Sequence, residues 1–162
     1  MSSAPAFESK ICPPGELAAR LKSIKRPLVF TNGVFDILHR GHITYLAQAR
    51  ALGASLLVGA NSDTSAKALG KGNDRPVNAL EDRLAVLAAL EAVTLVTWFE
   101  QDTPLELILA AKPDVLVKGG DWNPEAIVGA REVKSWGGAV HSIPFQHQRS
   151  TTDLLARIRG KR

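Results

Sequence analysis

The chain has 162 residues, 45% of them hydrophobic and 22% charged, with a formal net charge of +4. These values are typical of a folded globular protein and exclude a disordered or fibrous chain. No apolar run reaches membrane-spanning length and the N-terminus lacks a signal-peptide core, so we expect a cytoplasmic protein that binds no membrane. The basic residues are scattered, which argues against a nucleic-acid partner, but the charge suits small anions. The single cysteine, Cys12, excludes an internal disulfide.

Residues 1–14 are rich in Ser, Ala and Pro, and we expect them to form a disordered N-terminal tail. The pattern of residues 15–25 predicts a short amphipathic helix, which ends before Pro27. Residues 15–162 contain no internal repeat and no second hydrophobic core, so we expect them to form a single domain.

Short apolar runs alternate with helical periodicities along the rest of the chain. The predicted strands span residues 27–30, 55–61, 95–98, 114–118 and 139–143. The predicted helices span residues 43–52, 80–92, 103–112, 126–136 and 154–159. A Gly- and Lys-containing connection over residues 64–78 is long enough to predict a functional or mobile loop. Strands that alternate with helices predict an α/β fold with a mainly parallel five-stranded sheet.

Residues 31–42 join the first strand to the helix that follows it, at the sheet edge where α/β folds bind ligands. His39 and His42 lie three residues apart, so both rings could reach one group near the helix N-terminus. That terminus favours an anion, and imidazole N–H groups can bind phosphate oxygens. The alternatives are a metal site completed by Asp36, which lacks further His or Cys ligands, and two structural histidines.

Three other segments have both a functional and a structural interpretation. Lys67, Lys71 and Arg75 on the long loop could neutralise a polyphosphate, or could belong to an ordinary solvated loop. Residues 150–152, Ser-Thr-Thr, could cap the last helix or bind an anion there. Residues 118–122, Lys-Gly-Gly-Asp-Trp, could supply a cation and close backbone contacts, or form a simple turn. Arg83 could be a phosphate anchor or a surface charge.

The sequence has no Walker-type phosphate loop, no Gly-x-Gly-x-x-Gly after the first strand and no Ser or Cys in a nucleophile elbow. Covalent catalysis is therefore not indicated. A reaction that relies on positioning and charge stabilisation, such as phosphoryl or nucleotidyl transfer, fits these residues better.

Together, the Gly-Val-Phe-Asp turn, His39-Arg40-Gly41-His42 and the terminal Ser-Thr-Thr resemble the cytidylyltransferase-like nucleotidyltransferases, which share a histidine–x–glycine–histidine signature. The resemblance implies a Rossmann-like three-layer sandwich. Within this superfamily, residues 75–78 (Arg-Pro-Val-Asn) and 117–121 (Val-Lys-Gly-Gly-Asp) are similar to the adenylyltransferases of ADP-heptose synthesis.

This resemblance implies that AMP passes from ATP to D-glycero-β-D-manno-heptose 1-phosphate, with Mg²⁺, for lipopolysaccharide inner-core synthesis in a homo-oligomeric enzyme. The implied catalytic residues are His39, His42 and Lys71. The implied nucleotide contacts, besides the two histidines, are Asn32, Gly33, Val34, Phe35, Asn61, Lys67, Arg75, Lys118, Gly120, Asp121, Ser150, Thr151 and Thr152. The implied substrate contacts are Asp36, Arg83 and Trp122. No metal ligands are predicted.

The sequence departs from the family pattern in two places. Phe145 stands where the glycerol-phosphate branch has an arginine before its Ser-Thr-Thr, which argues against that branch. The stretch between Lys67 and Arg75 is about one residue longer than in the heptose enzymes, so the choice between Lys67 and Lys71 stays open. A cytidylyltransferase of a polyol phosphate such as glycerol 3-phosphate and a non-catalytic nucleotide-binding module are the alternative functions.

Overall fold

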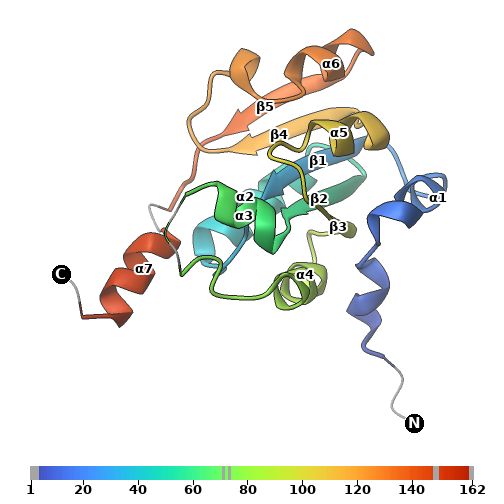
Figure 1. Cartoon of the computed structure of the whole chain (residues 1–162). Helices are drawn as coiled ribbons and strands as arrows, with labels where there is room; N and C mark the ends of the chain where they lie inside the picture. Colours follow the sequence, from blue (N-terminus) through green and yellow to red (C-terminus); the bar gives the residue numbers. More distant parts are fainter. Residues whose placement is uncertain (1–3, 71, 73, 148–149, 161–162) are drawn as a thin grey trace.

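A five-stranded parallel sheet forms the centre of the chain in the computed structural model shown in Figure 1, which describes residues 4–70, 72, 74–147 and 150–160. The strands are β1 (Leu28–Gly33), β2 (Ser55–Asn61), β3 (Leu95–Phe99), β4 (Val115–Gly119) and β5 (Ala139–Ile143). They lie in the order β3-β2-β1-β4-β5, and each neighbouring pair is parallel. The predicted α/β fold is confirmed.

Helices connect the strands and precede the sheet. The α-helices are α1 (Leu17–Leu21), α2 (Arg40–Arg50), α3 (Asp63–Ala68), α4 (Leu80–Ala89), α5 (Leu105–Ala111), α6 (Ala130–Ser135) and α7 (Thr151–Ile158). The short 3-10 helices are η1 (Ala6–Lys10), η2 (Pro14–Glu16) and η3 (Pro124–Ala126). No helix among the described residues is long and apolar enough to cross a membrane.

The sheet is covered on both faces because its strands carry apolar side chains on both sides. Along β1, Leu28 and Phe30 belong to one hydrophobic cluster and Val29 to the other. The Val29 cluster includes buried residues of α2 and α4, whereas the Phe30 cluster includes those of α1, α5 and α6. The result is a three-layer sandwich.

The connections change direction between β1 and β4. The chain runs outward from β1 to β2 and β3 on one side, and then crosses back to β4 and β5 on the other. Open α/β sheets bind ligands at such a switch point, outside the carboxyl ends of the strands. This geometry brings together the start of α2, where His39 and His42 lie, and the end of β4 with the loop that follows it, where Lys118 and Trp122 lie.

The N-terminal segment differs from the expected disordered tail. Ala6–Lys10 form η1, which packs against α4, and Ile11 pairs with Val96 at the edge of β3. Cys12 is fully buried in the Phe30 cluster. Composition alone suggested a tail, but these long-range contacts hold the segment on the sheet edge.

Three local predictions also need correction. The predicted loop over residues 64–78 contains α3, a short polar helix capped by Ser62, which accepts a hydrogen bond from the amide of Ser65. The helix predicted over residues 103–112 is shorter than expected, because α5 begins only after Pro104, without a side-chain cap, and ends at Ala111. The helix predicted over residues 126–136 begins later, as α6 at Ala130, because Gly129 takes a left-handed conformation between η3 and α6.

Candidate functional site

An open cavity of about 370 Å³ lies at the carboxyl ends of β1 and β4. It is lined by Asn32, Gly33, Val34, Phe35, Asp36, His39, His42, Tyr45, Arg75, Lys118, Gly119, Trp122, Phe145, Ser150, Thr151 and Thr152. Among these lining residues Arg75 and Lys118 are cationic, and Asp36 is the single carboxylate. The cavity therefore has the charge and the position expected of an anion-binding site.

The two histidines form one stacked pair at the start of α2. His39 is the N-cap residue, with an extended backbone, and His42 lies in the first turn. Their ring centroids are 3.9 Å apart with an interplanar angle of 26°. Both rings line the cavity beside the backbone amides of the α2 N-terminus. The predicted convergence of the two side chains is confirmed.

Gly41 is required by the way that His39 folds across the first turn of α2. A Cβ atom at position 41 would lie 3.0 Å from Nδ1 and Cε1 of His39 and 3.1 Å from the carbonyl oxygen of His147. Contacts this short are rare for a real Cβ atom, so any side chain here would displace the imidazole or the neighbouring chain. The glycine between the histidines thus has a steric cause.

The turn between β1 and α2 contains a strained residue. Phe35 has a φ of 48°, in the left-handed region that residues other than glycine rarely adopt. Its ring is buried and meets the His42 ring edge-on, with centroids 5.6 Å apart. The strained backbone therefore places an aromatic side chain against one of the two histidines.

Asp36 fastens the loop at Arg75–Asn78 to this turn. Its carboxylate accepts hydrogen bonds from Nε of Arg75 at 2.7 Å and from the amides of Val77 and Asn78 at 2.9 Å each. Burial acts to raise the pKa of Asp36, but these donors outweigh burial and hold its pKa below the ordinary value. Since this carboxylate is satisfied within the protein, its role is to position Arg75 at the cavity.

Tyr45 and Phe145 line the cavity but were not among the predicted site residues. Their rings meet edge-on with centroids 5.6 Å apart, and Phe145 also meets His42 at 6.4 Å. The Tyr45 hydroxyl shares a hydrogen bond with the buried hydroxyl of Thr31, and burial raises the pKa of Tyr45. These aromatic rings form an apolar wall beside the histidines.

The end of β4 and the loop that follows it form the opposite wall. Lys118 lies with its Nζ 5.9 Å from the centre of the Trp122 ring, and Trp122 is half exposed. Gly120 has a φ of 112°, and a Cβ atom there would lie 2.9 Å from Nε1 of Trp122. The glycine therefore allows the tight turn that brings the indole back over Gly119, whose carbonyl accepts its N–H at 3.1 Å.

The N-terminus of α7 completes the lining. Ser150 is the N-cap residue, and its hydroxyl accepts a hydrogen bond from the amide of Asp153 at 2.9 Å, as the capping interpretation predicts. Thr151 donates a hydrogen bond to the carbonyl of Ile37 at 3.2 Å, which fixes α7 against the loop before α2. In Figure 1, α7 lies to one side of the sheet, away from the N-terminal helices.

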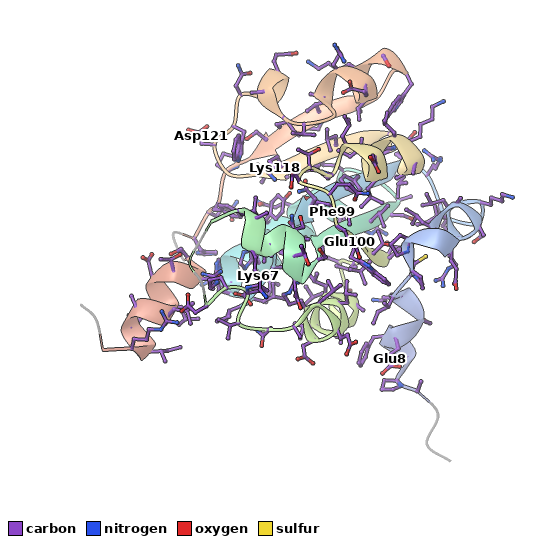
Figure 2. The ribbon with its side chains drawn as sticks, in the orientation of Figure 1. Glu8, Lys67, Phe99, Glu100, Lys118 and Asp121 are labelled. Atoms are coloured by element: carbon purple, nitrogen blue, oxygen red, sulfur yellow. The ribbon has the colours of Figure 1, made fainter. Side chains whose placement is uncertain are left out.

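Several predicted contacts lie outside the cavity lining. Asn61 is buried, and its amide donates to the Ser65 hydroxyl at 2.9 Å, so it supports the end of β2. Arg83 is also buried, with 1% of its surface exposed, and is neither a surface charge nor accessible to a substrate. Lys67 is exposed near the end of α3, and Figure 2 labels it apart from Lys118 at the end of β4.

Gly120 and Asp121 do not line the cavity either. Gly120 shapes the turn, and Asp121 is exposed on the loop after β4, where Figure 2 labels it. The predicted catalytic residue Lys71 lies outside the described residues. Of the two predicted loop cations within the described residues, Lys67 and Arg75, only Arg75 lines the cavity.

A family model for cytidylyltransferase-like proteins matches residues 30–156. This match covers most of the chain and includes both histidines and the terminal Ser-Thr-Thr. The chain belongs to the cytidylyltransferase-like family. The resemblance inferred from the sequence is therefore confirmed.

Relatives of this cytidylyltransferase-like chain include an adenylyltransferase and a bifunctional protein. It is 56% identical over 161 residues to D-beta-D-heptose 1-phosphate adenylyltransferase of Bordetella bronchiseptica, covering 98% of this chain and 99% of that protein. It is 54% identical over 142 residues to the bifunctional protein HldE of Escherichia coli O157:H7, covering 88% of this chain and 29% of HldE. The chain thus spans less than a third of the bifunctional relative.

Solved structures agree with the fold of the cytidylyltransferase-like chain. The crystal structure of a lipopolysaccharide core biosynthesis protein from Thermoplasma volcanium matches with a TM-score of 0.62 and 29% identity, covering 75% of this chain and 98% of that one. Pantoate-beta-alanine ligase from Francisella tularensis matches with a TM-score of 0.61 and 16% identity, covering 92% and 76%, which supports the fold alone.

The described part of this cytidylyltransferase-like chain contains no group of three or more His, Cys, Asp or Glu side chains that could hold a metal ion. Asp36 is the single acidic residue in the cavity lining and is already bound by Arg75, Val77 and Asn78. This donor set does not fit a metal held mainly by protein ligands. It fits an ion that arrives with a polyphosphate, because Mg²⁺ usually keeps its waters and phosphate ligands.

Proposed function

We propose that this chain transfers the adenylyl group of ATP to D-glycero-β-D-manno-heptose 1-phosphate, giving ADP-heptose and pyrophosphate. The observation that carries the proposal is the 56% identity, over nearly the whole of both chains, to a heptose 1-phosphate adenylyltransferase. The cationic cavity at the switch point supports it, since nucleotidyl transfer needs a site for a triphosphate.

In the proposed reaction, a phosphate oxygen of the sugar phosphate attacks the α-phosphorus of ATP. A new P–O bond forms to the sugar phosphate, and the bond between the α-phosphorus and the bridging oxygen breaks. The electron pair leaves with pyrophosphate, so negative charge grows on the leaving group. A protein accelerates such a step by positioning the reactants and by stabilising this charge.

The residues suited to this task surround the cavity. His39 and His42 stand at the α2 N-terminus, where imidazole N–H groups and backbone amides can donate to phosphate oxygens. Arg75 and Lys118 add positive charge on two sides of the cavity. We assign the histidine pair to the phosphates and leaving group, and the backbone of Val34 and Phe35 to contact with the nucleotide. Trp122, exposed at the rim, is assigned to the sugar.

Two proposed roles rest on the family resemblance alone. Lys71 is assigned to phosphate binding on the loop after α3. Mg²⁺ is assigned to the ATP phosphates, where it would neutralise charge, and Asp36 and Asp121 are not assigned as its ligands. We also assign Ser150, Thr151 and Thr152 to the border of the nucleotide site, since the N-terminus of α7 reaches the cavity.

The proposed cellular role is the supply of ADP-heptose for the lipopolysaccharide inner core, in the cytoplasm. A homo-oligomer is the proposed assembly. The exposed side chain of Ile158 (70% exposed) and the half-buried Leu154 and Leu155 on α7 supply apolar surface that suits self-association.

A pyrophosphate-release assay tests the function by crossing ATP, CTP, GTP and UTP with heptose 1-phosphate and glycerol 3-phosphate. We expect rapid pyrophosphate release only in the combination of ATP with heptose 1-phosphate. Faster release with CTP and glycerol 3-phosphate would replace the proposal with the polyol-phosphate alternative. Binding of ATP without release in any combination would identify a non-catalytic nucleotide-binding module.

A further inference from the structure

Arg83 is the largest fully buried side chain among the described residues, although it is charged. It lies on α4, and its guanidinium makes four hydrogen bonds to groups from three separate segments. NH1 donates to the carbonyls of Val34 at 2.7 Å and Asn61 at 2.8 Å. Nε donates to the carbonyl of Asn78 at 3.1 Å, and NH2 pairs with Asp63 at 2.7 Å.

Two of these partners flank the strained turn of the cavity. The carbonyl of Val34 immediately precedes Phe35, whose φ of 48° is unfavourable for a residue with a side chain. On the other side of Phe35, the backbone carbonyl of Asp36 accepts a hydrogen bond from Nδ2 of Asn78 at 2.7 Å. The turn is therefore held before and after Phe35 by Arg83 and by the segment that Arg83 also binds.

A strained conformation persists only when its surroundings over-determine it. The strained turn shapes the site, because Phe35 packs against His42 and residues 32–36 line the cavity. Release of the Val34 carbonyl would let the turn relax. The histidine pair and the backbone next to the nucleotide would then lose their common geometry.

We propose that Arg83 is a positioning residue for nucleotide binding: its buried guanidinium ties Val34, Asn61 and Asn78 together and so holds the strained Phe35 turn against His42. This inference rests on the proposed function, but its central claim concerns ATP binding and not the sugar. It replaces the expected role of Arg83 as a substrate contact, which its burial excludes.

A lysine side chain cannot reproduce the hydrogen bonds of the Arg83 guanidinium. A guanidinium presents five N–H donors in a planar fork, whereas an ammonium is a compact point charge with three donors on a flexible stem. Arg83→Lys keeps the positive charge next to Asp63 but loses the geometry that reaches Val34, Asn61 and Asn78 at once. The substitution therefore separates charge from positioning.

The test compares full-length wild type with Arg83→Lys and one control variant, at a temperature well below unfolding of each. Arg26→Lys is the matched control, because Arg26 also binds a carboxylate (Asp114, 2.8 Å) and a carbonyl (Lys112, 3.2 Å). Arg26 lies just before β1, at the amino ends of the strands and therefore at the end of the sheet opposite the cavity.

Isothermal titration with ATP alone is the primary readout, and the kcat and KM of the adenylyl-transfer reaction are the second. We expect Arg83→Lys to weaken ATP binding roughly tenfold and to lower kcat/KM for ATP by roughly 10- to 100-fold, as misplaced catalytic groups do. The Arg26→Lys control should stay within about twofold of wild type. Unchanged ATP binding by a folded Arg83→Lys variant would reduce Arg83 to a structural role and overturn the inference.

Asn78→Ala keeps the inference testable if Arg83→Lys does not fold. Asn78 is half-buried, and the substitution removes only the side-chain donor to the Asp36 carbonyl. We expect ATP binding to weaken several-fold in this variant, and unchanged binding would overturn the inference. If wild type binds ATP but transfers no adenylyl group to heptose 1-phosphate, the proposed function fails while the positioning role is still decided by ATP binding.

Discussion

His39 and His42 are close enough to act on the same phosphate group, because their rings stack with centroids 3.9 Å apart at the N-terminus of α2. We expect His39→Ala or His42→Ala to lower kcat by roughly 10²-fold or more, as loss of one donor to a developing charge does. Pyrophosphate release under saturating substrates measures the effect.

His141→Ala is the matched control for the histidine variants, since His141 is an exposed residue of β5 that does not line the cavity. Its kcat should stay near the wild-type value. The double variant His39→Ala/His42→Ala should lose less than the product of the single losses, because contacting residues are rarely additive. Near-normal turnover in either single variant would contradict the assigned role.

The first turn of α2 links backbone sterics to catalysis at the scale of an element. Alanine normally stabilises a helix relative to glycine by about 1 kcal/mol. At Gly41, however, the added Cβ would lie 3.0 Å from the His39 ring. We therefore expect Gly41→Ala to lower kcat roughly tenfold, through displaced His39, while thermal unfolding changes little. A stabilised variant with full activity would show that His39 does not need its observed position.

The loop at Arg75–Asn78 depends on the ionised Asp36 carboxylate, whose pKa lies below its ordinary value because its hydrogen bonds outweigh the effect of burial. A carboxylate with a lowered pKa in the folded state stabilises the protein fully above its unfolded pKa, near ~4. This stabilisation is lost as pH falls through the folded-state pKa.

Asp36→Asn should therefore destabilise the protein by about 3 kcal/mol at neutral pH, because it leaves Arg75 without its charged partner. The difference in free energy of unfolding between variant and wild type should shrink as the pH is lowered below ~4. Urea denaturation across this range measures it. A difference that stays constant with pH would mean that the Asp36 charge is not the stabilising feature.

Sequence patterns predicted best the elements whose limits are marked by local signals. β2 and β5 have the predicted bounds, since an apolar run over residues 56–60 ends at polar Asn61, and residues 139–143 follow a clear helix stop. Short polar α3 was missed, because its capping by Ser62 and its contacts with β2 depend on the folded sheet.

Sequence also predicted most of the candidate site, because the carboxyl ends of parallel strands must meet at one sheet edge. It misplaced Arg83 and Asn61, since polar residues in a functional stretch look the same whether they bind a ligand or support the loops that do. Tyr45 and Phe145 were missed for the opposite reason. Their rings resemble ordinary core residues. Tyr45 lies on α2, three residues after His42, whereas Phe145 follows β5 and reaches the histidines only in the folded sheet.

At the scale of the whole molecule, the cavity is shared between two parts of the fold. β1, its following turn and α2 supply the histidines and the backbone, and β4 supplies Lys118 and Gly119. These parts rest on both hydrophobic clusters of the sandwich. In contrast, α7 contributes Ser150, Thr151 and Thr152 without burying any of its helical residues.

This contrast predicts that α7 serves binding more than folding. A chain that ends at residue 149 would lose the hydroxyls of residues 150–152 and the ion pair between Arg159 and Asp74, but no buried helical side chain. We expect thermal unfolding to shift by about 1 kcal/mol or less, because exposed contacts contribute little. ATP affinity, measured by titration calorimetry, should fall roughly tenfold as one wall of the site is lost.

Ser150→Ala separates the cap of α7 from its wall of the cavity. Loss of the hydrogen bond from the Asp153 amide to Ser150 should cost the helix about 1 kcal/mol. The helix stays attached to the chain in this variant, and Thr151 still bonds to Ile37, so ATP affinity should fall less than in the truncated chain. Undiminished ATP affinity in the truncated chain would show that the nucleotide does not use the α7 wall. A large loss of folding stability would instead show that α7 is part of the folded core.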